Sequence, residues 1–544
     1  MQLDHGKHTK PEILSYFFIL IGIGIASTIL KVALLVADVV PFNSDEAIVG
    51  LMARHFLQGN WTAFFYGQAY MGTLDTSLVA GAFALFGPQV FLIRIVQMVL
   101  YIGTIATTGY IGSQIFRSNS VGFLSAGLMV IPSVNVTLYT TVSLGGYGEV
   151  LLLGNILIIA ALKIHAGSKR AWYVLWGFIA GVGIWAFGLI LIYIFPTSIL
   201  LLYRNVINKE RKRGLGDLSI TAIALCLGLS PWIIWAFSNG FSPLLQELFG
   251  SAISGASSSN PFVAILAHLY NFLLFGPTVI FGLRPPWEVR WLALPLLPLA
   301  LAFWLVILIH AFQSLAKKDE AQIGRWILVG VMTTLVVGFI FTPFGADPSG
   351  RYFLPFAVPL SIFAAEFCIH LNQHSKKIKW GYLLPAAILA FNLWGTIDAV
   401  KNYPPGLTTQ FDSITWIDHR FDDELISFLK HNGETRGYSN YWVSYPIAFQ
   451  SDEEVIFIPT LPYHQDFRYT ARDNRYQPYN TIVEESDRVA YITTNHPGLD
   501  EHLQRVFQQA GVTWEETWIG DYHVFYQLSD VVRPENVGID ELQP

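Results

Sequence analysis

The stretch EILSYFFILIGIGIASTILKVAL, residues 12–34, decides what kind of protein this is. An apolar run of roughly 20 residues is long enough for a helix to cross the hydrocarbon core of a bilayer. The run is too long for a signal peptide and has no obvious small-residue cleavage site. We therefore expect it to be retained as the first membrane-spanning helix.

Composition extends this interpretation to the whole chain. Its 544 residues are 53% hydrophobic and 13% charged, about half the charged fraction of a soluble domain. The net charge of -6 is modest, and the basic residues are scattered in short segments, which argues against nucleic acid as a partner. Cys226 and Cys368 lie in separate apolar runs, where we interpret them as buried side chains rather than a disulfide or metal pair.

Similar apolar runs recur to about residue 397, and they predict an α-helical polytopic membrane protein with about 11 transmembrane helices. A further apolar run, 262–283, is either a span or a re-entrant segment. The predicted spans are 12–34, 91–113, 119–139, 148–166, 171–187, 188–203, 217–237, 291–312, 325–342, 353–371 and 380–397.

Basic residues fall on one side of these spans, which the positive-inside rule makes cytoplasmic. They are Lys7, Lys10, Arg117, Lys163, Lys169, Arg170, the basic residues of 204–213, Lys317, Lys318 and those of 376–379. We therefore expect a cytoplasmic N-terminus in the plasma membrane. The outward parts are then residues 35–90, 254–262, 341–355 and everything after 397.

The chain divides by composition into a polytopic domain, 1–397, and an outward-facing soluble domain, 398–544. The second part mixes helix-like stretches, such as DDELISFLKHNG at 422–433, with strand-like ones, such as YHVFYQL at 522–528. This alternation predicts a small α/β domain. It contains no glycine-rich phosphate loop, so a nucleotide site is not expected.

The first outward loop places two acids, Asp45 and Glu46, at the start of an amphipathic helix. Ser44 is suited to cap that helix, and acids in a first turn complement its dipole. At 100° per residue Asp45 shares the apolar face, whereas Glu46 points about 100° away. An inward carboxylate at a membrane surface is costly unless it is paired or used, so Asp45 is the stronger functional candidate.

Other polar residues at the outer ends of spans are weaker candidates. Asp75 is a second acid in a predicted surface helix, or simply a helix-start residue. Glu149, beside Tyr147, is an acid that needs a partner at the end of a span. Arg94 is an outward arginine.

The late loop GADPSGRYFLP, 345–355, brings Arg351 to the start of a span. An arginine there either extends its side chain to the interface or binds a phosphate, for which the guanidinium is well shaped.

Together these segments resemble the GT-C membrane glycosyltransferases. The resemblance rests on DEA at 45–47, YGQAYMGTLDTSLVAGAFALFG at 66–87, the arginine-led second span and RYFLP at 351–355. The closest likeness is to the branch of dolichyl-phosphate-mannose protein mannosyltransferases and aminoarabinose transferases (glycosyltransferase family 39-like). The tail stretch GYSNYWVSYPIAFQSDEEVIFIPT, 437–460, resembles the outward C-terminal domain of bacterial members.

The resemblance implies transfer of a hexose or pentose from a polyprenyl-phosphate donor to an acceptor hydroxyl of a glycan, lipid or protein at the outer face. It implies Asp45 as base with Glu46 beside it, and Arg351 with Tyr352 near the donor phosphate. Asp75, Glu149, Tyr147 and Arg94 are additional candidates. No second phosphate-binding basic residue is evident, and the middle domain of the protein mannosyltransferases is missing.

The chemistry accounts for these residue types. Breaking the bond between the anomeric carbon and phosphate builds positive charge on the sugar and negative charge on the phosphate, so a carboxylate and an arginine are both needed. No cofactor is required, although Asp45, Glu46 and Glu149 could supply oxygen ligands to a divalent metal. Alternatives are a secondary transporter, which would place its acids near the bilayer midplane, and a protein that binds or assembles lipid-linked glycans.

Overall fold

The computed structural model describes residues 10–167, 169–207, 211–248, 260–374, 379–402 and 406–536. The chain forms two compact units. The helical unit comprises residues 1–36, 97–141 and 146–399, and the outer unit comprises 37–96, 142–145 and 400–544. The first loop, which the sequence predicts to face outward, thus belongs from residue 37 onward to the same unit as the C-terminal tail. The serine-rich loop 254–259 and residues 376–378 of the basic segment lie outside the described residues.

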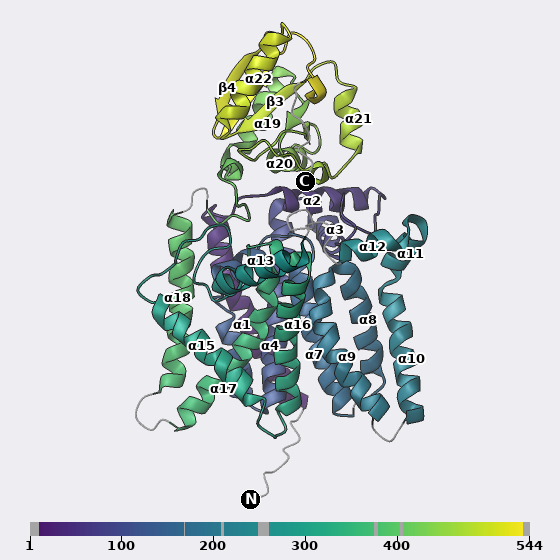
Figure 1. The fold of residues 1–544 in the computed structure, drawn as a ribbon, viewed down its shortest axis with the longest axis vertical. Helices are drawn as coiled ribbons and strands as arrows, with labels where there is room; N and C mark the ends of the chain where they lie inside the picture. Colours follow the sequence, from purple (N-terminus) through teal and green to yellow (C-terminus); the bar gives the residue numbers. More distant parts are fainter. Residues whose placement is uncertain are drawn as a thin grey trace, which may run out of the picture. The chain divides into compact units, whose positions relative to one another are not determined.

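Long apolar helices build the helical unit (Figure 1). Two of its helices, α4 and α18, each contribute residues at one end to the outer unit. The bounds are α1 Lys10–Val36, α4 Val90–Phe116, α5 Asn119–Leu128, α6 Val134–Tyr139, α7 Tyr147–His165, α8 Ala171–Ala186, α9 Leu191–Leu202, α10 Arg211–Gly228, α11 Ser230–Asn239, α12 Phe241–Leu248, α13 Pro261–Leu274, α14 Gly276–Ile280, α15 Leu297–Ser314, α16 Gln322–Phe341, α17 Ala357–His374 and α18 Trp380–Asn402.

Within the described residues, 9 helices are long and apolar enough to cross a membrane, or 10 if a pair bent by 63°, Gly214–Gly228 with Ser230–Asn239, is one span. The polytopic helical fold is confirmed. The run left open in the sequence, 262–283, corresponds to a candidate span of 20 residues, Pro261–Ile280.

Besides the bent pair, which corresponds to the predicted span 217–237, two further predicted spans differ from the structure. The prediction 119–139 was wrong as a continuous helix, because the chain breaks between α5 and α6 around Pro132, which has no backbone N–H to donate. The prediction 171–187 corresponds to α8, which has 16 residues and is shorter than a bilayer core requires. The following run does form a candidate span, Gly188–Asn205.

Glycines let α8 and α10 pack closely. A Cβ on Gly177 would lie 2.3 Å from the Thr221 carbonyl oxygen, and one on Gly181 would lie 2.2 Å from that of Leu225. Small residues are common where transmembrane helices pack, because they let the two backbones come close together. The hydrophobic effect does not drive helices together within lipid, so close packing contributes to their association instead. A larger side chain at Gly177 or at Gly181 would therefore force α8 and α10 apart.

The outer unit combines helices from the first loop with the tail domain. Helix α2, Ser44–Leu57, packs against α3, Leu74–Phe86, and against α20, Tyr441–Gln450. The tail contributes three further helices: α19 Asp422–Asn432, α21 Pro478–Glu484 and α22 Pro497–Gln509.

A five-stranded sheet in the order β2-β1-β3-β5-β4 forms the tail's centre (Figure 1). Strand β1 pairs in parallel with β2 and β3, whereas β5 pairs antiparallel with β3 and β4. The predicted α/β tail is confirmed. The strand bounds are β1 Arg436–Ser439, β2 Ile456–Pro459, β3 Ala490–Thr494, β4 Glu515–Ile519 and β5 Tyr522–Tyr526.

Candidate functional site

Helix α2 presents the two acids of the first loop. Its N-cap is Asn43, whose side chain accepts a hydrogen bond from the Glu46 backbone N–H at 3.0 Å. The expected cap, Ser44, instead donates its hydroxyl to the Tyr441 carbonyl oxygen at 2.5 Å. The prediction was one residue off because Ser44 is already inside the helix and is buried by a tail segment.

The helical projection assigned burial to the wrong one of the two acids. Glu46 is fully buried, at 0% exposure, whereas Asp45 is half-buried. The projection failed because nearly every side of α2 is covered within the outer unit, so no single apolar face exists. Asp45 is consequently the more accessible carboxylate.

Glu46 is paired rather than available. Arg94 donates from Nε and Nη2 to the two Glu46 carboxylate oxygens at 3.0 and 2.9 Å. Arg94 is itself only 7% exposed and also donates to the Pro41 carbonyl oxygen. Buried charges need a partner of opposite charge. This bidentate contact therefore indicates that Glu46 and Arg94 stabilise the structure.

Asp45 accepts a hydrogen bond from the tail. The Tyr441 hydroxyl donates to Asp45 Oδ1 at 2.6 Å. Tyr441 begins α20, where Asn440 caps the helix by accepting a hydrogen bond from the Trp442 backbone N–H at 2.9 Å. Burial and the nearby Asp45 carboxylate raise the pKa of Tyr441, so this hydroxyl remains a donor at physiological pH.

Arg475 supplies the positive charge of this cluster. Its guanidinium lies 5.4 Å from the centre of the Tyr441 ring. Burial opposes its charge, but Tyr441, Tyr70, Asp45 and Asp473 outweigh burial and raise the pKa of Arg475. Among the described residues its Nε and Nη1 are buried without a hydrogen-bond partner. Two guanidinium nitrogens of Arg475 therefore have unused hydrogen-bonding capacity.

Asp473 is the second acid beside Arg475. It is 7% exposed, and burial raises its pKa to about 6, against the opposing effects of Arg475 and a hydrogen bond with Tyr463. The nearby Asp45 carboxylate adds to that rise. The cluster of Asp45, Tyr441, Asp473 and Arg475 thus combines residues from the first loop and the tail.

Asp75 lies in the first turn of α3 and is 2% exposed. The Ser143 hydroxyl donates a hydrogen bond to Asp75 Oδ2. This contact ties the start of α3 to residues 142–145 within the outer unit, which favours the helix-start interpretation of Asp75.

The helical unit brings together the late-loop candidates. Arg351 pairs through Nε with Asp347 Oδ2 at 2.7 Å, and its guanidinium lies 5.2 Å from the centre of the Tyr352 ring. The rings of Tyr352 and Tyr147 are 6.5 Å apart. Glu149 lies in the first turn of α7, two residues after Tyr147, and is 1% exposed. Arg351, Tyr352 and Tyr147 therefore form one cluster.

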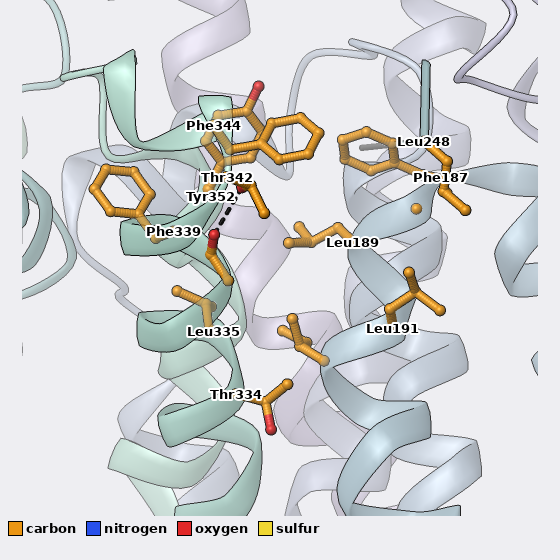
Figure 2. A pocket seen from close by; sticks show the side chains of 13 residues that line it. Phe187, Leu189, Leu191, Leu248, Thr334, Leu335, Phe339, Thr342, Phe344 and Tyr352 are labelled. Atoms are coloured by element: carbon orange, nitrogen blue, oxygen red, sulfur yellow. Dashed lines mark hydrogen bonds between the residues drawn. The ribbon is translucent and has the colours of Figure 1, made fainter. Parts of the chain in front are cut away.

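A largely apolar cavity of about 190 Å³ adjoins this cluster. Figure 2 shows residues of the Gly188–Asn205 span, such as Leu189 and Leu191, on the right of the cavity and residues of α16, such as Thr334 and Leu335, on the left. Tyr352 contributes to the lining and is next in sequence to Arg351. The cavity therefore offers apolar volume beside Tyr352, whose ring lies 5.2 Å from the Arg351 guanidinium.

Sequence reasoning missed three members of the outer cluster: Tyr441, Asp473 and Arg475. The sequence offered one signal that could have identified these residues, a concentration of aromatic and charged side chains in two short stretches. These stretches are NYW at 440–442 and RDNRY at 472–476. Across the described part of the chain, no group of three or more His, Cys, Asp or Glu side chains could hold a metal ion.

Comparisons with known proteins identify the fold. No model of a known protein family and no curated protein sequence matches the chain. Solved structures do match. ArnT from Cupriavidus metallidurans, crystallised with undecaprenyl phosphate, is 10% identical, with a TM-score of 0.54 over 97% of this chain and 100% of that one.

An archaeal enzyme matches equally well in structure. The apo oligosaccharyltransferase of Archaeoglobus fulgidus is 13% identical, with a TM-score of 0.53 over 88% of this chain and 69% of that one. Both matched proteins are GT-C membrane glycosyltransferases. This chain is a multi-pass integral membrane protein with the GT-C glycosyltransferase fold.

Proposed function

We propose that this protein transfers a sugar from a polyprenyl-phosphate donor to an acceptor hydroxyl at the extracytoplasmic face of the membrane. The GT-C fold supports a lipid-phosphate sugar donor. The single observation that carries the proposal is the half-buried Asp45 carboxylate, which is hydrogen-bonded by Tyr441 and lies beside the positive charge of Arg475.

Asp45 acts as the base. The Tyr441 hydrogen bond occupies Oδ1, which orients the carboxylate and directs Oδ2 at the acceptor hydroxyl. As the acceptor oxygen forms a bond to the anomeric carbon, Oδ2 takes its proton and the bond from the anomeric carbon to the phosphate oxygen breaks. Polyprenyl phosphate leaves with that electron pair, and direct displacement inverts the anomeric centre.

Arg475 is a positioning residue in this proposal. Its guanidinium carries positive charge near Tyr441 and Asp45, and the attraction between opposite charges helps to hold the carboxylate in its orientation. Glu46 is committed to Arg94 and contributes to the site by fixing α2 rather than by contacting substrate.

Arg351 binds the donor phosphate. Its guanidinium is already oriented by Asp347, and a guanidinium can donate two parallel hydrogen bonds to phosphate. The neighbouring apolar cavity, which Tyr352 lines, accommodates the first isoprene units of the carrier.

A transfer assay tests both roles. Purified protein in lipid nanodiscs is supplied with radiolabelled polyprenyl-phosphate sugars, and sugar released or transferred is counted for wild type and Asp45→Asn. We expect Asp45→Asn to lower kcat by at least about 100-fold, since general-base catalysis typically contributes 10²–10⁴-fold. Arg351→Ala should chiefly raise KM for the donor.

Arg117→Ala is the matched control, because Arg117 forms an exposed surface ion pair with Glu320 and such pairs contribute little. Transfer should persist in EDTA, since no cofactor is proposed. Full activity of correctly inserted Asp45→Asn would exclude Asp45 as the base. No release of sugar by folded wild type from any donor would favour transport or assembly instead.

A further inference from the structure

A second cavity lies wholly within the outer unit and has a different character. Its volume is about 580 Å³, within the usual range for small-molecule sites of roughly 300–1,000 Å³. Aromatic and uncharged polar side chains dominate its lining. The lining residues are Gln410, Phe411, Asp412, Ser413, Thr415, Trp442, Tyr463, His464, Gln465 and Arg468.

Two aromatic rings form a corner of this cavity. The rings of Trp442 and Tyr463 are 6.2 Å apart and nearly perpendicular, at 76°. Trp442 is fixed by the Asn440 cap of α20. Among the described residues, the indole Nε1 of Trp442 is buried without a hydrogen-bond partner. A buried indole N–H normally has an acceptor, so this N–H group of a lining residue has unused hydrogen-bonding capacity.

Polar groups lie around the aromatic corner. His464 Nδ1 is 3.2 Å from Asp412 Oδ2, and Asp412 Oδ1 accepts a hydrogen bond from the Ile414 backbone N–H at 3.1 Å. These contacts hold the Asp412 carboxylate in place. Gln465 is exposed at the rim, and Gln410 is buried beside it in the lining.

The charge balance disfavours an anionic ligand. Arg468 is the arginine of the lining, and its guanidinium already pairs with Asp466 at 2.8 Å. The Asp412 carboxylate would repel a phosphate. A neutral pyranose matches these groups instead, because its C–H faces are apolar and stack on aromatic rings, while its hydroxyl rim bonds to carboxylate, amide and indole groups.

We propose that this cavity binds a neutral pyranose residue of a glycan, and that this glycan is the acceptor. The second half of this inference rests on the proposed transferase function, whereas the binding itself does not.

Two contacts connect the cavity to the Asp45 cluster. The rings of Trp442 and Tyr441 are 4.7 Å apart at 88°, and Tyr463 forms a hydrogen bond with Asp473. Two lining residues, Trp442 and Tyr463, therefore contact members of the Asp45 cluster. A glycan held at Trp442 and Tyr463 lies beside the residues that orient Asp45.

Binding is measured without donor. Full-length protein in lipid nanodiscs, free of sugar-based detergent, is titrated with soluble hexasaccharides of glucose, mannose, galactose and N-acetylglucosamine, and contact is read by saturation-transfer-difference NMR and calorimetry. We expect one or more hexasaccharides to bind, and Trp442→Ala to weaken that binding at least about tenfold, as expected for loss of a central aromatic contact.

Phe411→Ala provides a second variant that should fold, because Phe411 is 50% exposed; it too should weaken binding. Trp518→Ala, a tail tryptophan that is 62% exposed and outside the cavity, should not. Equal affinity of wild type, Trp442→Ala and Phe411→Ala would overturn the assignment. The assignment would also be overturned if a Ser/Thr-rich peptide or inorganic phosphate bound and no hexasaccharide did. The absence of any binding would overturn it as well.

The two proposals fail separately. An unaffected Asp45→Asn enzyme would refute the proposed base, while the hexasaccharide titrations would still decide whether the cavity binds glycan. Conversely, transfer that depends on Asp45 with no glycan binding at Trp442 would refute this inference alone.

Discussion

At the scale of single residues, the chemistry proposed for the outer unit depends on one carboxylate and the groups that orient it. Asp45 is separated from Tyr441 by 396 residues in the chain, yet the two side chains share a hydrogen bond of 2.6 Å. Hydrogen bonds to charged groups contribute about 1.5–3 kcal/mol. The Tyr441 hydroxyl should therefore matter for the rate as much as for the fold.

Tyr441→Phe removes this hydrogen bond and keeps the ring. We expect kcat to fall about tenfold or more, because the carboxylate loses its orientation, and the free energy of unfolding to fall by about 1.5–3 kcal/mol, because a hydrogen bond to a charged group is lost. The measurement is steady-state transfer. Tyr438→Phe is the control, since Tyr438 is another buried tail tyrosine whose hydroxyl accepts a hydrogen bond from Arg533. Equal losses in both variants would contradict a specific role.

The elevated pKa of Asp473 predicts a pH-dependent stability. Burial raises this pKa to about 6, whereas an unfolded aspartate titrates near 3.9. The folded state therefore binds the proton more tightly. The resulting stability is fully present below about pH 4 and is lost as pH rises through about 6.

Asp473→Asn stays neutral and should retain that stability. We expect the variant to be more stable than wild type at about pH 8, by on the order of 2 kcal/mol, with the difference shrinking below about pH 6. Thermal unfolding followed by tryptophan fluorescence across this range measures it. Asp466→Asn, at an exposed aspartate, should show no such trend. A constant difference at all pH values would refute the elevated pKa.

At the scale of elements, the site depends on how closely α2 and α20 pack. A Cβ on Gly50 of α2 would lie 2.6 Å from Phe449 Cε2 of α20 and 3.1 Å from Ile93 Cδ1. Only a glycine permits this approach, because an added side chain would displace the ring. The helix that begins with Tyr441 is thereby held against the helix that presents Asp45.

Gly50→Leu should separate the two helices. Overpacking typically costs 1–3 kcal/mol, and moving α20 also removes the Tyr441 hydroxyl from Asp45, so we expect both stability and transfer to fall. Gly81→Leu is the matched control, because no atom of the described residues lies within 4 Å of a Cβ at Gly81 of α3. Unimpaired transfer by Gly50→Leu would show that the α2–α20 contact is dispensable.

At the scale of the whole molecule, the proposed function requires the tail and the basic loops to lie on opposite sides of the membrane. With Cys226 and Cys368 first replaced by alanine, Glu501→Cys in α22 and Lys318→Cys after α15 place single thiols at exposed positions. In intact cells, a membrane-impermeant maleimide should label only Glu501→Cys. Lys318→Cys should react after permeabilisation, as the positive-inside rule predicts. The reverse pattern would exclude an extracytoplasmic site.

Local sequence patterns predicted much of the fold. Long apolar runs, the change of composition near residue 397 and the alternating strands and helices of the tail are all properties of short segments. The tail helix predicted at 422–433 is α19, and the strand predicted at 522–528 is β5. The errors fell where a local feature overrode hydropathy, as at the break between α5 and α6.

The sequence by itself determined a polytopic helical protein with an α/β tail and directed attention to Asp45 and Arg351. Only the tertiary structure decided that Glu46 is neutralised by Arg94, that Tyr441 contacts Asp45 and that Arg475 and Asp473 set the charge around it. The physical reason is sequence separation. The spacing of apolar residues along the sequence indicates which face of a helix is apolar. It does not indicate which polar group from a distant part of the chain will lie against that helix.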